Sequence, residues 1–178
     1  DTPLPPDEPA GQNPPDGAIL HYWLPDDASR VTLEVLDETG AVVRRYASDD
    51  PPEPLVEGRN TPDYWIRPHH SLARTRGLHR FVWDLRHERP AVASFSYPIA
   101  AIARNTPRTP LGSWVLPGRY TVRLDAGGLT RTAPLVVRMD PRVKAPEAAI
   151  RRQHELSRAL DRGIRRTSAA LAAARGQG

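Results

Sequence analysis

The stretch Val31-Thr-Leu-Glu-Val-Leu-Asp-Glu-Thr-Gly-Ala-Val-Val-Arg-Arg-Tyr-Ala47 decides the fold class. Val31, Leu33 and Val35 recur with a period of two, which places their side chains on one face of an extended strand. The Asp-Glu-Thr-Gly segment that follows supplies turn residues, and the chain returns antiparallel through Ala47. The stretch therefore predicts a β-hairpin that turns one apolar face toward a core.

Further strands are predicted on both sides of this hairpin. Residues 18–24 are rich in β-forming residues, residues 77–85 form another strand, and residues 120–124 and 129–139 form a second hairpin around a Gly-Gly turn. We expect Trp23 and Trp83, which both lie in strands, to be buried. The sequence thus predicts a mainly β fold: an immunoglobulin-like antiparallel β-sandwich with long Pro-rich loops and a C-terminal α-helix.

The composition divides the chain into three parts. Residues 1–17 are rich in proline, which predicts an interdomain linker. We expect residues 18–140 to form the β-sandwich and residues 141–178 to form a C-terminal helical extension. Within the extension we expect a helix over 147–174. Apolar residues at helical spacing form a stripe along one face of this helix. Its other face is rich in arginine, and we expect the apolar stripe to pack against a neighbouring domain rather than a membrane.

Charge and composition exclude several classes of protein. The sequence pI is about 9.9, but Lys144 is the only lysine, and the arginines alternate with acidic residues instead of forming a basic stripe. We therefore expect no nucleic-acid partner. The absence of cysteine excludes disulfides and thiolate metal sites, and no apolar run approaches the roughly 20 residues that span a bilayer. The first residues lack the pattern of a signal peptide and begin without Met, which predicts a mature or proteolysed fragment, or a recombinant piece, of a longer protein.

No catalytic or metal-binding constellation is recognisable. His69 and His70 are adjacent and so point to opposite faces of a regular strand, and His21 and His154 are isolated in the sequence. The grouped carboxylates lie in Pro-rich turns, where aspartate is favoured for its hydrogen bonds to the backbone. The serines lack a nucleophile motif, and no phosphate-binding glycine motif is present. We expect no catalytic residues, no metal and no cofactor.

The loop aromatics are the best candidates for a binding site. Two long connections, over residues 48–76 and 86–117, carry aromatic side chains that either pack over the edge of the sandwich or contact a ligand. An exposed, coplanar pair among them would favour a sugar-stacking platform. The candidate binding residues are Trp65, Trp114, Tyr97 and Tyr64.

Several motifs together resemble one group of proteins. They resemble the C-terminal region of bacterial secreted proteins that carry sortilin-type or sialidase-like BNR-repeat β-propellers, a region with an immunoglobulin-like or fibronectin-III-like fold, and the resemblance spans about residues 11–160. The order of motifs also looks like the immunoglobulin-like fold of flagellar hook-capping proteins and secretion-linked C-terminal domains. The residues that carry the resemblance are 13–18, 31–37, 40–44, 64–66, 77–86, 97–99 and 116–124.

The resemblance implies an accessory role in an exported protein. In such proteins this region follows the propeller, so it implies the propeller of the same parent protein as partner and a periplasmic or extracellular location. The aspartate-box pattern of propeller blades is missing here, so no catalytic residue is carried over. The expected function is a non-catalytic interaction domain that packs on or spaces the propeller. A carbohydrate-binding module with a polysaccharide ligand is the alternative, and a glycoside-hydrolase fragment, with paired carboxylates in a pocket, is a third.

Overall fold

The computed structural model describes residues 9, 11, 14–59, 61–92, 94–98 and 104–175. The linker predicted over residues 1–17 lies largely outside this part of the chain. The predicted strands, the hairpins and the C-terminal helix are all present. In chain order the elements are β1 (Ala18–Leu24), β2 (Val31–Leu36), β3 (Val42–Ala47), a 3-10 turn η1 (Asp63–Trp65), β4 (Gly77–Trp83), β5 (Gly118–Ala126), β6 (Leu129–Val137) and α1 (Glu147–Arg175).

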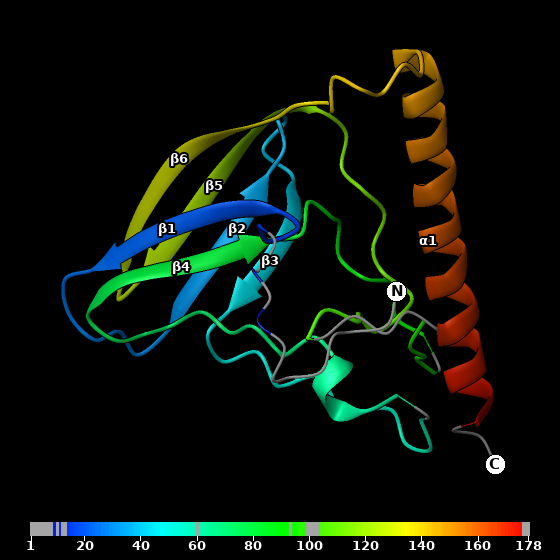
Figure 1. Ribbon diagram of the computed structural model, residues 1–178, viewed down its shortest axis with the longest axis horizontal. Helices are drawn as coiled ribbons and strands as arrows, with labels where there is room; N and C mark the ends of the chain where they lie inside the picture. The colour runs from blue at the N-terminus through cyan, green and yellow to red at the C-terminus, as the bar shows by residue number, and fades with distance from the viewer. Residues whose placement is uncertain are drawn as a thin grey trace.

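The strands form two antiparallel sheets. One sheet has two strands in the order β1-β4, and the other has four in the order β3-β2-β5-β6. Figure 1 shows the β1-β4 sheet lying across the four-stranded sheet. The β2-β3 and β5-β6 pairs are the two hairpins that the turn sequences predict, and β5 pairs along the free side of β2. The fold is therefore mainly β, with two sheets packed as a β-sandwich and one C-terminal helix.

The core fills the space between the two sheets. Val31, Leu33 and Val35 of β2 are fully buried, as their period of two predicts. Trp83 of β4 is also fully buried and meets Tyr120 of β5 edge to face, with ring centroids 5.8 Å apart. The other buried apolar residues of this cluster are Tyr22, Leu24, Val43, Leu72 and Phe81.

The expected burial of Trp23 is wrong. This side chain is 61% exposed, because β1 turns Tyr22 and Leu24 toward the core instead. The pairing with β4 fixes that choice: Leu20 lies opposite Phe81, so the face of β1 that carries Leu20 also faces inward. Trp23 consequently lies on the outer face of the β1-β4 sheet.

Helix α1 stands beside the sandwich and covers neither sheet (Figure 1). It runs along the loops that join β4 to β5, and Asp161, near its middle, is the buried residue of the helix. Part of the apolar stripe predicted for this helix does not pack on the sandwich, since Leu156 and Leu160 are 50% and 67% exposed. No helix in the described part of the chain is long and apolar enough to cross a membrane.

Candidate functional site

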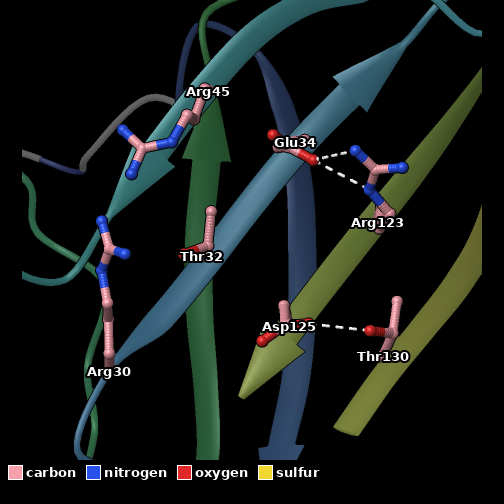
Figure 2. A pocket seen from close by; sticks show the side chains of 7 residues that line it. All are labelled: Arg30, Thr32, Glu34, Arg45, Arg123, Asp125 and Thr130. Atoms are coloured by element: carbon pink, nitrogen blue, oxygen red, sulfur yellow. Dashed lines mark hydrogen bonds and ion pairs between the residues drawn. The ribbon is translucent and has the colours of Figure 1, made fainter. Parts of the chain in front are cut away.

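A polar groove of about 400 Å³ lies on the outer face of the four-stranded sheet. The period of two that buries Val31, Leu33 and Val35 turns Thr32 and Glu34 outward. The strand register then places Glu34 between Arg45 of β3 and Arg123 of β5. Figure 2 shows these side chains standing on one face of the sheet. The groove is lined by Arg30, Thr32, Glu34, Arg45, Arg123, Asp125 and Thr130.

The charged groups of the groove largely neutralise one another. Both Nε and Nη2 of Arg123 donate to Oε2 of Glu34, with the Nε contact at 2.8 Å (Figure 2). Nε of Arg30 donates to Asp49 at 2.9 Å, and this hydrogen bond lowers the pKa of Asp49 from its ordinary value. The groove therefore offers paired guanidinium and carboxylate groups, which suit the hydroxyls of a polar ligand better than a multiply charged one.

The two carboxylates of the groove are both engaged. Glu34 accepts the fork from Arg123, and Asp125 accepts a hydrogen bond of 2.7 Å from the hydroxyl of Thr130. A glycosidase needs one protonated and one ionised carboxyl group on opposite sides of the bond that it cleaves. Both carboxylates of the groove are therefore occupied by neighbouring side chains of the groove itself.

Tyr64 and Trp65 do not form a flat stacking surface. Both belong to the 3-10 turn η1, and their rings meet edge to face with an interplanar angle of 76°. Tyr64 is 55% exposed, whereas Trp65 is half-buried and its indole nitrogen is buried without a hydrogen-bond partner. This loop therefore offers a ligand one exposed phenol ring.

Trp114 is the second most exposed of the four candidate binding residues, after Tyr64, with 54% of its surface exposed. The guanidinium of Arg86 lies 3.6 Å from the centre of its ring and covers one of its two faces. Tyr97 is half-buried in the same long connection. Of the four candidates, only Tyr64 and Trp65 make a ring contact with each other in the described residues. The structure therefore does not bring these side chains into one platform.

The histidines are arranged differently from what their spacing suggests. His154 is isolated in the sequence, but its ring lies beside His87, with centroids 5.4 Å apart. Burial of the His87 ring, together with the nearby charges of Arg158 and His154 and against those of Asp161 and Asp37, lowers its pKa from the ordinary 6.5 to about 4. Within the described ranges no three His, Asp or Glu side chains are placed to hold a metal ion.

A second candidate surface is the outer face of the β1-β4 sheet. Trp23 lies opposite Leu78, which is 70% exposed, and Ile19, 42% exposed, lies opposite Val82. These two apolar pairs flank the pair formed by His21 and Arg80. An outer face with two apolar pairs on either side of a His and an Arg has the mixed composition of a protein–protein interface.

Sequence reasoning missed the groove, this apolar face and the histidine pair. The alternation in residues 31–36 already assigns Thr32 and Glu34 to the outer face, so it could have pointed to the groove. Comparisons with family models, with curated proteins and with solved structures found no match for this chain.

Proposed function

We propose that this chain is a non-catalytic interaction module that packs against a neighbouring folded domain of a larger exported protein. The partner that the sequence resemblance implies is a β-propeller of the same parent protein, in the periplasm or outside the cell. The observation that carries the proposal is the exposed apolar face of the β1-β4 sheet. An isolated domain gains nothing from leaving Trp23 and Leu78 paired with each other and exposed to water.

The chemistry of this face fits a protein partner. Trp23 and Leu78 are paired across the strands and both are mostly exposed, so a partner surface covers them together. Burying one side chain of this size contributes about 1.5–3 kcal/mol. Arg80, beside them, supplies a charged group of the kind found at the centre of interfaces. The engaged carboxylates of the groove add support for a role in binding rather than catalysis.

Replacing Trp23 is expected to weaken binding to the propeller portion of the parent protein. Trp23→Ser or Leu78→Ser removes the centre of the proposed interface, and we expect the dissociation constant to rise by at least about tenfold. Isothermal titration calorimetry measures this. Trp114→Ser is the matched control, because Trp114 is almost as exposed but lies elsewhere, and it is expected to leave the affinity unchanged. Equal losses from both tryptophans, or no binding by the wild-type chain, would reject the β1-β4 face as the interface.

A carbohydrate-binding module is the second candidate, and the polar groove favours it. Titration of the chain with a panel of polysaccharides tests it separately. Under the interaction proposal we expect no saturable binding. Sugar binding that is lost in Arg123→Ala would place the ligand in the groove, and sugar binding lost in Trp114→Ala would place it at the loop aromatics. Either result would favour carbohydrate recognition over the proposed role.

A further inference from the structure

The contacts that hold helix α1 on the sandwich are polar. Asp161 is buried, and its Oδ2 accepts hydrogen bonds from the hydroxyl of Ser113 at 2.7 Å and from the backbone N–H of Ser113 at 3.4 Å. The same oxygen faces Nη1 of Arg158 at 3.4 Å. About one turn further along α1, the guanidinium of Arg165 donates hydrogen bonds to the backbone oxygens of Glu88 and Arg89 at 3.0 and 2.6 Å.

The histidine pair lies in the same contact. Nδ1 of His154 is 2.9 Å from the backbone oxygen of Trp114, so in the neutral ring this nitrogen is the protonated one. His87 belongs to the loop after β4. Its backbone is held within the sandwich loops, because its N–H donates to the backbone oxygen of Ser113 at 2.9 Å. The two rings thus meet where the helix touches the loops that it lies against.

Apolar burial adds little to this attachment. The residues of α1 that are least exposed recur mainly along one stripe at a spacing of three and four. Six of the nine are polar, namely His154, Ser157, Arg158, Asp161, Arg165 and Ser168, and the others are Ile150, Gly163 and Ile164. Leu156 and Leu160 face away from that stripe and are largely exposed. A helix with this distribution depends on a few hydrogen bonds and ring contacts, which a change of charge at the contact can break.

We propose that α1 is a detachable element, released from the sandwich when the imidazole of His87 takes up a proton. The added charge would face Arg158 and His154 on the helix. On its own segment His87 lies between Arg86 and Glu88, and Glu88 already forms an ion pair with Arg44 of β3. Asp37 in the β2-β3 turn and Asp161 on α1 are the opposing acids, and Asp161 is already occupied by Ser113 and Arg158. A proton on His87 therefore meets more repulsion than attraction in the docked state.

The direction of the pH dependence follows from the two states of His87. In the docked state its pKa is about 4, and in a hydrated, undocked state it returns toward 6.5. Between these values the undocked state binds more protons, so docking is fully favourable above about pH 6.5 and weakens as the pH falls toward 4. The stability of the contact is present at neutral pH and lost on acidification.

The distance between α1 and the sandwich tests this directly. The chain has no native cysteine, so Thr132→Cys on β6 and Ala172→Cys on α1 accept spin labels at only those two positions. We expect a single narrow distance distribution at about pH 7.5 and a broad one at about pH 4.5, with the equilibrium constant for docking falling by at most about tenfold per pH unit. A cooperative chemical-denaturation transition at the lower pH, followed by circular dichroism, reports that the sandwich itself stays folded.

Variants identify the responsible group. His87→Gln, which cannot take up a proton, is expected to keep α1 docked at the lower pH. His70→Gln, at an exposed position in the loop before β4, is expected to leave the transition unchanged. A wild-type chain that stays docked at both pH values overturns the proposal. So does a transition that persists in His87→Gln and is shifted by Asp161→Asn, because it would assign the release to the carboxylate.

Discussion

Trp83→Ala is expected to lower the free energy of unfolding by about 3–5 kcal/mol. The side chain is fully buried between the two sheets, so truncation removes its contacts with both and leaves a cavity. Its indole Nε1 also donates a hydrogen bond of 3.1 Å to the backbone oxygen of Arg86, which would lose its donor. Chemical denaturation followed by circular dichroism measures the loss.

Trp23→Ala is the matched control for this truncation. It removes the same side chain from the outer face of the neighbouring strand, where 61% of it is exposed. We expect a change well under about 1 kcal/mol, because little of the ring leaves a packed environment. If Trp83→Ala cost as little as Trp23→Ala, the placement of β4 over the four-stranded sheet would be wrong.

Gly112→Ala is expected to destabilise the chain by roughly 3 kcal/mol, because no space exists for a methyl group there. A Cβ at this position would lie 2.0 Å from the backbone oxygen of His87 and 2.8 Å from its carbonyl carbon. Both atoms belong to the backbone, so the two segments would have to separate. That would break the neighbouring hydrogen bond from the His87 N–H to the oxygen of Ser113.

Gly163→Ala provides the contrasting result. This glycine lies inside α1, and a Cβ there would meet no atom within 4 Å apart from the neighbouring backbone of the helix itself. Alanine is the better helix former by about 1 kcal/mol, so we expect a small gain in stability. Thermal unfolding of the two variants side by side checks both expectations. A Gly112→Ala chain as stable as the wild type would show that the segments around His87 and Gly112 do not approach as closely as the structure places them.

The strands could be predicted from sequence wherever the alternation is clean. Residues 31–36 have apolar side chains at every second position, and residues 77–83 have their two aromatic side chains, Phe81 and Trp83, on one face; both inward faces are as expected. In β1 both alternating sets contain large apolar residues, so the sequence does not decide which set is buried. The choice depends on β4, whose Phe81 and Trp83 define the inner side, and that pairing is a long-range property.

The candidate sites were harder to predict for the same reason. The groove depends on the order β3-β2-β5, which places Arg45 and Arg123 on either side of Glu34, and sequence spacing does not contain that order. The meeting of His87 and His154 depends on how a helix lies against loops that follow other strands. The four loop aromatics were identifiable as binding candidates, but their ring orientations depend on irregular backbone that periodicity does not describe.

The pairing of β1 with β4 sets the order in which the sandwich can assemble. The β2-β3 and β5-β6 hairpins join strands that are neighbours in the chain, so each can form as soon as its turn has been made. β1 is made first, yet its partner follows only after two more strands and a long Pro-rich connection. During synthesis the backbone of β1 therefore remains unpaired until β4 emerges, which leaves this strand open to pairing with other chains for longer than the hairpin strands.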